Sequence, residues 1–502
     1  MALTPTEQAA NARLSQYNGG RYDASTNQRG LAGDGYKTNV PAAFNDTGTV
    51  AGAVSRLADE ANAAAAVVAP AIPIVTAARD QAVAAAQTAA GIVQHVQPSE
   101  IAGIDPVVDF PFRASTAVPS GVITGSSGKW VTNQAGLLTF VPAGTAPIDF
   151  DPVTGALRGL LVEESRANLL TYSQQFDNAA WTKAGATVTA NAATAPDGTT
   201  TADKLVEDSG VGTHNVRQAA SGVTSGIAYT ASVYAKAAGR TQTRLVLESA
   251  GTIGVADYDL TAMTAALSSG TAASIAPAGN GWYRLSLTAT TNSTSVAVNV
   301  RPNVSGAQSY TGDGASGLYL WQAQAEAGSF ATSPAVTTSS TVTRAADVNT
   351  VALSSVPGWN ASEGTIYVEA AWVGLTGWPG IVSLHDGTNQ NMAILFASSN
   401  SPNTPRGSII TGGVAQAAEL GQTYSAVSSG QYFKAALAWK ANDFAFSRDG
   451  LDAVADTSGT VPPLTTLQIG AYPGSLVLNG WVRRVTLFPR RLSNATLKLL
   501  TA

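Results

Sequence analysis

Cysteine is absent from this chain of 502 residues. The absence excludes disulfide bonds, cysteine-ligated zinc and a thiol nucleophile, so stability must come from packing and assembly. Histidine is scarce too: only His95, His214 and His385 occur, and none stands in a metal-binding pattern such as HExxH. We expect these histidines to be surface or turn residues, and we predict neither a catalytic site nor a histidine-based metal site.

Charge is also scarce, because Asp, Glu, Lys and Arg make up only 12% of the residues and the formal net charge is −5. Without an excess of positive charge, neither nucleic acid nor an anionic membrane surface is an expected partner. The most apolar stretch, residues 61–78, is mostly alanine and contains Pro70 and Pro73, so we expect no membrane insertion. Residues 1–16 lack the basic start and apolar run of a signal peptide, which predicts cytosolic synthesis.

Beyond residue 98 the chain consists of short segments in which apolar and polar residues alternate, separated by Gly, Asn, Asp and Pro. In the segment 229–237 the alternation places Tyr229, Ala231 and Val233 on one face, and a second set of such segments begins at residue 364. The pattern predicts a mainly β protein with two antiparallel β-sandwiches of jelly-roll type, preceded by an α-helical stalk.

Composition divides the chain into six segments, whose boundaries follow changes in glycine, alanine and β-forming residues. We expect a Gly-broken arm (1–49), an Ala-rich helical stalk or coiled coil (50–98), a β-rich connector (99–159), a jelly roll (160–342), a linker (343–360) and a second sandwich (361–502). Ser493 is placed to cap a short terminal helix that closes the second sandwich.

A heptad pattern runs through the second half of the stalk. Apolar residues recur at a and d positions, which are Val75, Ala78, Ala82, Ala85, Ala89, Ile92 and Val96. So narrow a stripe buries too little surface to stabilise one helix alone, so we expect parallel self-association along this seam. A single helix packed on a neighbouring subunit is the alternative.

Five short motifs resemble segments common in tailed-bacteriophage virion proteins, namely tail-fibre, tailspike and head-spike chains. They are Arg113–Thr116, Asp149–Gly155, Gly159–Leu170, Leu318–Gly328 and Thr343–Val348, with Gln322 and Ala325 departing from the usual closing strand. The resemblance implies a carbohydrate-binding-module-like jelly roll, and residues 364–502 look like a concanavalin A-like (laminin G-like) domain. Such folds host ligand binders and inert spacers alike.

The resemblance implies a virion fibre or spike on the particle surface, assembled in the host cytoplasm. Self-association as a homotrimer, docking to phage tail, neck or capsid proteins through residues 1–49, and attachment to a host cell-surface glycan are the expected partnerships. One alternative is a passive head- or neck-decorating fibre without a specific receptor. A polysaccharide-degrading tailspike is the second alternative.

Aromatic rings beside hydrogen-bonding side chains are the chemistry that a glycan site needs. Trp378 lies in a Gly/Pro loop and is followed by His385, Asp386 and Asn389, so these four residues are the predicted glycan-binding set. The alternative for Trp378 is a loop tryptophan tucked into the sandwich or into a subunit interface.

The acidic residues give little evidence of a catalytic site. Glu163 and Glu164 are adjacent and would point to opposite faces of a strand, which does not suit a dyad acting on one glycosidic bond. Asp313, or Asp386 with Gly387, could help to hold a Ca²⁺ ion in a loop. No other cofactor is expected, and the chain is predicted not to be an enzyme.

Overall fold

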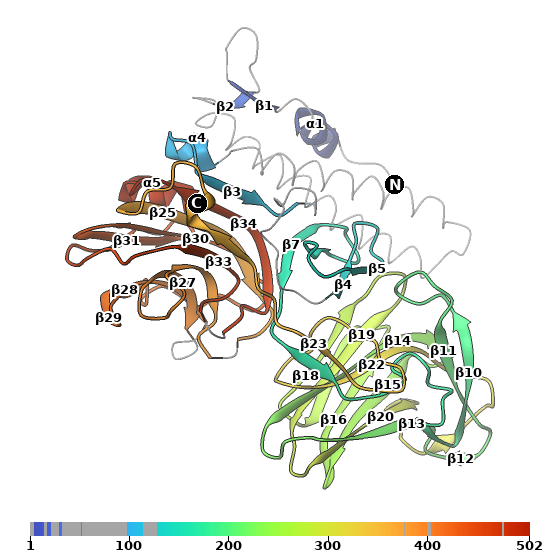
Figure 1. Cartoon of the computed structure of the whole chain (residues 1–502). Helices are drawn as coiled ribbons and strands as arrows, with labels where there is room; N and C mark the ends of the chain where they lie inside the picture. Colours follow the sequence, from blue (N-terminus) through green and yellow to red (C-terminus); the bar gives the residue numbers. More distant parts are fainter. Residues whose placement is uncertain are drawn as a thin grey trace.

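Figure 1 shows the computed structural model of the chain. The structure describes residues 5–14, 18–21, 30–32, 52, 98–113, 128–375, 377–398, 403–473 and 476–502. Before residue 98 these include the helix α1 (Pro5–Leu14) and a parallel pair of strands, β1 (Asn18–Arg21) and β2 (Gly30–Ala32). The predicted heptad seam, from Val75 to Val96, lies outside the described residues.

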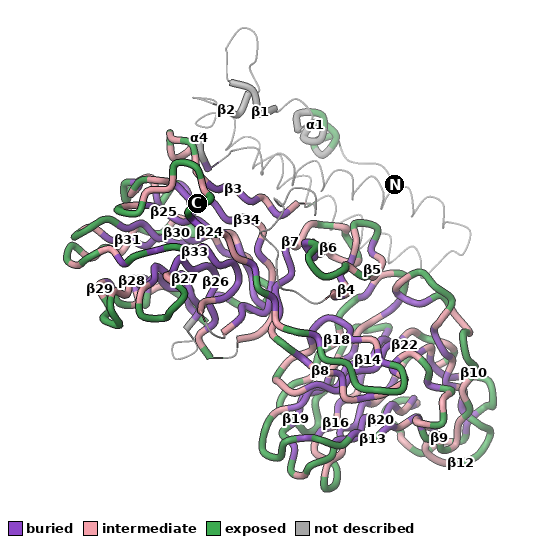
Figure 2. Tube along the Cα trace, in the orientation of Figure 1, coloured by how far each residue is buried: buried purple, intermediate pink, exposed green. Residues whose placement is uncertain are grey.

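From residue 98 onward the described chain is built almost wholly of antiparallel strands, which confirms the mainly β prediction. Two sandwiches stand side by side in Figure 1, one drawn mostly in green and yellow and the other mostly in orange and red. We call them the inserted sandwich and the C-terminal sandwich. Buried residues run along the strands of both, as Figure 2 shows.

The inserted sandwich consists of two six-stranded sheets and a short ribbon. The first sheet has the order β10 (Ala186–Ala193), β11 (Ala202–Glu207), β22 (Gly317–Ala327), β14 (Ala228–Ala238), β19 (Tyr283–Thr290) and β18 (Ala272–Pro277). The second has the order β17 (Thr264–Ser269), β16 (Gly251–Asp259), β15 (Gln242–Ser249), β20 (Ser295–Asn303), β13 (Asn215–Ser221) and β9 (Thr182–Ala184). The ribbon pairs β12 (Val211–Gly212) with β21 (Tyr310–Thr311).

The C-terminal sandwich also has two sheets. One has the order β24 (Thr350–Ala352), β33 (Thr466–Ile469), β26 (Gly380–His385), β27 (Met392–Ser398), β28 (Thr404–Thr411) and β29 (Val414–Leu420). The other has the order β32 (Val454–Asp456), β31 (Asp443–Arg448), β30 (Phe433–Lys440), β25 (Glu363–Trp372), β34 (Gly480–Phe488), β7 (Leu157–Val162) and β6 (Ile148–Phe150), and β3 (Val108–Pro111) also pairs with β34.

The C-terminal sandwich is therefore discontinuous in sequence, which differs from the expected segments. Strands β3 and β6 come from the stretch expected to be a connector (99–159), β7 crosses from that stretch into the expected jelly roll (160–342), and β24 comes from the stretch expected to be a linker (343–360). These strands complete a sheet whose inner face is apolar, and that burial decides their position. The whole inserted sandwich interrupts this domain between β7 and β24.

A connecting ribbon joins the two sandwiches. Its strands, β8 (Arg166–Asn168) and β23 (Val342–Arg344), pair antiparallel, so the chain enters and leaves the inserted sandwich side by side. A hairpin of β4 (Lys129–Thr132) and β5 (Leu138–Val141) lies against the inserted sandwich, where Trp130 meets Trp321 edge-on with ring centroids 6.3 Å apart. The hairpin brings Lys129 to the ribbon.

Two short helices cover the outer face of the larger C-terminal sheet. They are α4 (Pro98–Ala102) and α5 (Asn494–Thr501), and Leu497 and Leu500 of α5 are buried against strands β25 and β30. Ser493 caps α5, because its hydroxyl accepts a hydrogen bond from the backbone N–H of Thr496 at 3.1 Å. The predicted terminal helix and its cap are thus confirmed. A 3₁₀ turn at Leu353–Ser355 follows β24.

Candidate functional site

His385, one of the predicted glycan-binding residues, is buried at the end of β26. Its Nδ1 accepts a hydrogen bond from the backbone N–H of Gly387 at 2.9 Å, which leaves the ring proton on Nε2, 3.0 Å from Oε1 of Gln468. Burial lowers the pKa of His385. The imidazole is therefore a neutral group with both nitrogens engaged inside the protein, and it organises the loop that follows.

That loop holds Asp386 and Asn389 at the surface. Asp386 accepts hydrogen bonds from the backbone N–H of Thr388 at 2.9 Å and from the side chain of Asn391 at 2.8 Å. Asn389 is exposed, and its amide oxygen accepts from the side chain of Gln390 at 3.0 Å. The polar groups of the loop mostly satisfy one another, as expected for a turn stabilised by an Asp side chain.

Trp378 lies at the opposite end of β26 from this loop. Its ring stacks on Phe396 of β27, with centroids 5.7 Å apart and an interplanar angle of 6°. Since a strand advances about 3.3 Å per residue, the six residues of β26 separate Trp378 from Asp386 by about 20 Å. The structure therefore groups His385, Asp386 and Asn389 but does not bring Trp378 to them.

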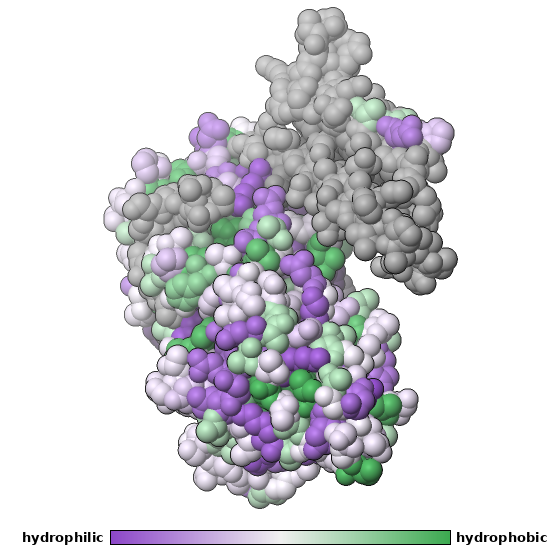
Figure 3. Space-filling view, turned by 90° about the vertical axis from the view of Figure 1, so that its right-hand side faces the viewer, coloured by the Kyte–Doolittle hydropathy of each residue, from purple (hydrophilic) through white to green (hydrophobic). Residues whose placement is uncertain are grey.

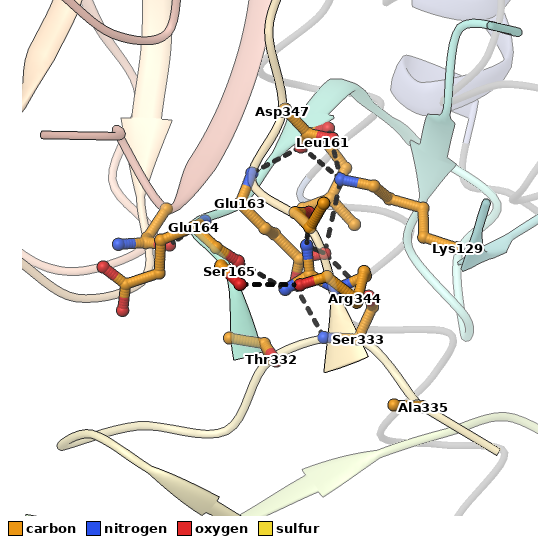
Figure 4. A network of polar contacts seen from close by, with 12 residues as sticks. Lys129, Leu161, Glu163, Glu164, Ser165, Thr332, Ser333, Ala335, Arg344 and Asp347 are labelled. Carbon is orange, nitrogen blue, oxygen red and sulfur yellow. Dashed lines mark hydrogen bonds and ion pairs between the residues drawn. The ribbon is translucent and has the colours of Figure 1, made fainter. Parts of the chain in front are cut away.

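A cluster of deeply buried charges lies at the connecting ribbon, in the junction network drawn in Figure 4. We use this name for Lys129, Glu163, Ser333, Arg344 and Asp347. Glu163 accepts hydrogen bonds from the backbone N–H (2.6 Å) and the hydroxyl (2.7 Å) of Ser333. The Nζ atom of Lys129 lies 3.5 Å from Glu163 and also contacts Asp347, and Nη1 of Arg344 lies 3.6 Å from Glu163.

The electrostatics of Glu163 follow from these contacts. Burial alone would raise its pKa, but Arg344, Lys129 and the Ser333 hydrogen bonds outweigh burial and lower the pKa to about 2. Asp347 accepts from the backbone N–H of Glu163 at 2.7 Å, although burial leaves the pKa of Asp347 raised. Glu163 is thus an ionised, paired group without access to a substrate.

The motifs that carry the resemblance supply much of this junction. Glu163, Glu164, Arg166 and Asn168 belong to one motif, and a second provides Arg344 and Asp347. Arg166 pairs with Glu164, while the side-chain amide of Asn168 donates to the carbonyls of Ala323 (3.1 Å) and Ala335 (2.9 Å). These side chains hold the ribbon in place, which is a structural role.

A different set of polar side chains covers the outer face of the second sheet of the inserted sandwich. On β13, β15, β16 and β20 the alternate residues enter the core, as Val216, Leu245, Tyr258 and Val298 do. The residues between them face outward. We call this set the polar face: Arg217, Arg244, Glu248, Asp257, Asn299, Arg301 and Asn303.

Ion pairs and amide contacts link the polar face across the strands. Arg244 binds both oxygens of Asp257, at 2.8 and 2.6 Å, and Asn303 donates to Asp257 at 3.2 Å. Arg217 donates to Glu248 at 2.7 Å. The Arg217 side chain is 38% exposed and the other charged groups are 21–28% exposed, so solvent reaches the face.

The centre of the polar face is incompletely paired. Arg301 reaches Glu248 only at 3.3 Å, and its Nε has no hydrogen-bond partner. The amide oxygens of Asn299 and Asn303 also have none, although these residues are only 2% and 3% exposed. Buried acceptors without donors are costly, by about 1–3 kcal/mol each, and ordered water is the common partner of such groups in proteins.

Sequence reasoning missed this face because it searched for aromatic rings in loops, and the seven side chains of the face include none. The sequence did contain an indication of this face. In segments 244–248 and 296–303 charged or amide side chains alternate with valine and leucine, and the two segments pair as neighbouring strands. Polar residues at alternate positions are ordinary on solvated strands, so the sequence could not show that they converge.

The rest of the described surface has few features of a binding site. Large apolar residues that are exposed, such as Phe140, Val211 and Val414, come from separate elements, and Figure 3 shows apolar residues scattered in small groups. A small cleft of about 210 Å³ is lined in part by Glu369, Tyr432 and Lys434.

The described part of the chain shows neither a cluster of metal ligands nor a membrane-spanning helix. Among these residues no three His, Cys, Asp or Glu side chains are grouped to hold a metal ion. Asp313, one of the loop acids considered for Ca²⁺, accepts hydrogen bonds from the backbone N–H groups of Ala315 and Ser316. No helix within the described ranges is long and apolar enough to span a membrane.

Comparison with known proteins finds similarity of fold only. No family model and no curated protein matches the chain. Among solved structures, CBM40 of the Ruminococcus gnavus IT-sialidase, solved with α2,3-sialyllactose, matches at 14% identity over 28% of this chain and 84% of its own, with a TM-score of 0.25. Domain 4 of AbnA, a GH43 extracellular arabinanase of Geobacillus stearothermophilus solved with arabinotriose, matches at 11% identity over 28% of this chain and 68% of its own (TM-score 0.24).

A leech intramolecular trans-sialidase matches at 15% identity over 31% of this chain, and the match spans only 26% of that enzyme (TM-score 0.26). At these identities and scores the matches carry no information about what this chain binds or does. Parts of this chain are similar in fold to sandwich modules of carbohydrate-active proteins.

Proposed function

We propose that this chain is a non-enzymatic, glycan-binding appendage protein, and that the polar face of the inserted sandwich is its binding surface. The observation that carries the proposal is the array of partly exposed charged side chains on one face of a sheet, where Arg217, Arg244 and Arg301 are 38%, 22% and 25% exposed. Sugars present hydroxyl groups that donate and accept in many directions, and a flat array of Arg, Asn and acidic side chains matches that chemistry.

A protein partner suits the polar face less well. Stable protein interfaces have an apolar, well-packed core, whereas the centre of this face offers only Val246, which is 2% exposed, and the partly buried Val255. Val246 forms a floor beneath the polar groups, opposite Asn299 and Val255 in the neighbouring strands. A glycan needs only such a small apolar contact beside its hydrogen bonds.

The virion role rests on the resemblance of the sequence motifs. In this proposal the chain is a tailed-phage fibre or spike that docks to tail, neck or capsid proteins through residues 1–49. The heptad residues from Val75 to Val96 join three copies, and the two sandwiches project toward a host-surface glycan. A passive decorating fibre would need no such array of partly exposed arginines and carboxylates on one sheet face, which is why the binding role is preferred.

Glycan-array binding by the full chain tests the function. We expect binding that Arg217→Ala and Asn299→Ala reduce at least tenfold, while Asn389→Ala, in the loop after β26, leaves it unchanged. Circular dichroism and thermal melting establish that each variant is folded. Loss of binding in Asn389→Ala alone would move the site to the sequence-predicted loop.

Two further outcomes decide the class of protein. Absence of binding to any glycan and to host cells would establish the passive fibre instead. Glycoside hydrolysis needs a pair of carboxylates that act on one bond, and the proposal assigns no such pair in the described chain. Release of reducing sugar from host polysaccharide would therefore overturn the non-enzymatic assignment.

Light scattering on the full chain tests the fibre assembly. We expect a trimer, and the double substitution of Ala85→Asp with Ile92→Asp should dissociate it, because like charges would be buried at the helix seam. The matched control is the double substitution of Ala84→Asp with Gly91→Asp, because both positions lie outside the seam. A monomeric wild-type chain would contradict the seam.

A further inference from the structure

We propose that the side chains of Lys129 and Asp347 become joined by an amide bond, an isopeptide cross-link that forms inside the folded protein with the release of one water molecule. Both residues belong to the junction network, and the ion pair described above is the state that precedes the bond. Because the chain has no cysteine, a covalent cross-link within it cannot be a disulfide. This inference goes beyond the proposed function and does not depend on it.

The two reacting groups are buried together. Lys129 is 1% exposed and Asp347 is 3% exposed, and Lys129 is the only lysine among the buried residues of the described chain. Its Nζ atom contacts Oδ2 of Asp347 across 218 positions of the sequence. Figure 4 shows the amine between Asp347 and Glu163. An amine and a carboxyl group that the fold holds in contact react as parts of one molecule, which removes most of the entropic cost of their encounter.

Burial favours the uncharged forms that the reaction needs. An amide forms when an unprotonated amine attacks a carboxylic acid, and the ion pair reaches these forms when one proton passes from Nζ to the carboxylate. Burial raises the pKa of Asp347, even though Lys129 opposes the shift. Against the effect of burial, Arg344 and Lys129 hold the pKa of Glu163 low. The proton transfer removes the charge of Lys129, so Glu163 becomes a stronger proton acceptor.

The hydrogen bonds of Asp347 match an amide better than a carboxylate. Its Oδ2 accepts from the backbone N–H of Glu163 at 2.7 Å, whereas its Oδ1 is buried without a hydrogen-bond partner. A carboxylate has two oxygens to satisfy and an amide has one, so the loss of Oδ1 as water removes the unsatisfied atom. The carbonyl oxygen of Leu161 lies 3.5 Å from Nζ, where it can accept from the N–H of the product.

The reaction balances without any other reactant. After the proton transfer the lone pair of Nζ forms a bond to Cγ of Asp347, and the π electrons of the carbonyl move onto Oδ2, where the backbone N–H of Glu163 stabilises the negative charge. The carboxylate of Glu163, whose Oε2 lies 3.5 Å from Nζ, takes a proton from the nitrogen and delivers it to the Oδ1 hydroxyl. The Cγ–Oδ1 bond breaks, the carbonyl re-forms at Oδ2, water leaves, and Glu163 is ionised again.

The cross-link would join the two ends of the insertion. Lys129 precedes the inserted sandwich and Asp347 follows it, so the amide would bridge the points where the chain enters and leaves. Tension between the chain before residue 129 and the strands after residue 347 would then pass through the amide. This route would protect the inserted sandwich from unfolding under load.

Intact-mass spectrometry of the denatured full chain tests the bond. We expect the wild-type chain to weigh one water molecule less than its sequence requires. Proteolysis should then yield a branched peptide that contains both Lys129 and Asp347. A wild-type chain of full mass would overturn the proposal, and so would a water deficit located at other residues. This measurement needs no variant, so it decides the proposal even where a variant fails to fold.

Variants assign the reaction to its residues. Lys129→Arg keeps the positive charge but has no amine to form the amide, so it should show no deficit. The matched control is Lys236→Arg, at a partly exposed lysine that donates to the carbonyl of Asn280, and it should keep the deficit. A deficit that persists in Lys129→Arg would overturn the bond.

Glu163→Gln leaves both reacting groups in place but removes the proton carrier. We expect this variant to form the bond about a hundredfold more slowly, measured as the fraction of cross-linked chain at fixed times after synthesis. Glu164→Gln is the adjacent control and should react as the wild type does. An unchanged rate in Glu163→Gln would overturn the role of Glu163.

Discussion

The junction network and the polar face are both clusters of basic and acidic side chains, yet they differ in burial. At the junction, Lys129 and Glu163 are 1% and 5% exposed, and two cations meet two carboxylates. On the polar face the charged groups are partly exposed, and Glu248 and Asp257 each lie within reach of arginines and of solvent.

The difference follows from the cost of desolvating a charge. A buried ion without a partner costs several kcal/mol, so a buried cluster must balance its charges internally. A face in contact with water can keep charged groups at low cost, because solvent screens them. Partly exposed charges at the surface remain available to a ligand, whereas a balanced buried cluster can only hold the fold together.

Breaking the junction should have the largest effect. Glu163→Gln leaves Lys129 and Arg344 buried with one carboxylate fewer, so we expect the free energy of unfolding to fall by about 3–5 kcal/mol. Chemical denaturation measures this loss. Glu164→Gln is the adjacent control, and because Glu164 is partly exposed its loss should stay below about 1 kcal/mol. Equal losses in the two variants would show that the junction does not depend on Glu163.

Acid should reproduce much of the same effect. The pKa of Glu163 is lowered from 4.5 to about 2 in the folded protein, so its contribution is fully present above pH 4.5 and disappears as the pH falls from 4.5 to 2. A shift of this size corresponds to about 3 kcal/mol. The raised pKa of Asp347 acts with the opposite sign, so the difference between wild type and Glu163→Gln across this range isolates Glu163. A constant difference would contradict the pairing.

An intermediate effect is expected at Trp378, the aromatic residue of the sequence-predicted set. Because its ring stacks on Phe396, Trp378→Ala should lower stability by about 1–3 kcal/mol without changing glycan binding. Thermal melting and array binding measure the two quantities. Reduced binding with unchanged stability would place the ligand at Trp378 after all.

The smallest change in stability is expected on the polar face. Arg301→Ala removes one of two arginines that oppose each other across β15 and β20, so stability should change by no more than about 0.5 kcal/mol, or rise slightly. Denaturation of this variant beside Glu163→Gln gives the direct comparison of the two clusters. A loss comparable to that of Glu163→Gln would mean that the polar face is structural as well.

Local features of the fold were predictable from sequence. The alternation around Tyr229 and Val233 corresponds to β14, and Ser493 caps the terminal helix as expected. These features depend on residues close together in the chain, for which side-chain periodicity and capping chemistry suffice.

Relations between distant residues were not predictable in this way. Lys129 meets Asp347 across 218 positions, and β3 and β7 join a sheet formed mainly by residues beyond 361. One sequence contains no information on which strands share a sheet edge. The same limit applies to the predicted set, in which Trp378 and Asp386 lie near in sequence but at opposite ends of a strand.

The sequence by itself determined the strand-rich composition, the cap of α5 and the absence of cysteine chemistry, because these depend on residue type and local spacing. Only the tertiary structure decided that one sandwich interrupts the other and that Arg244 and Arg301 stand opposite each other. Sheet register is set by burial of a whole apolar face, which sums contributions from segments far apart in the chain.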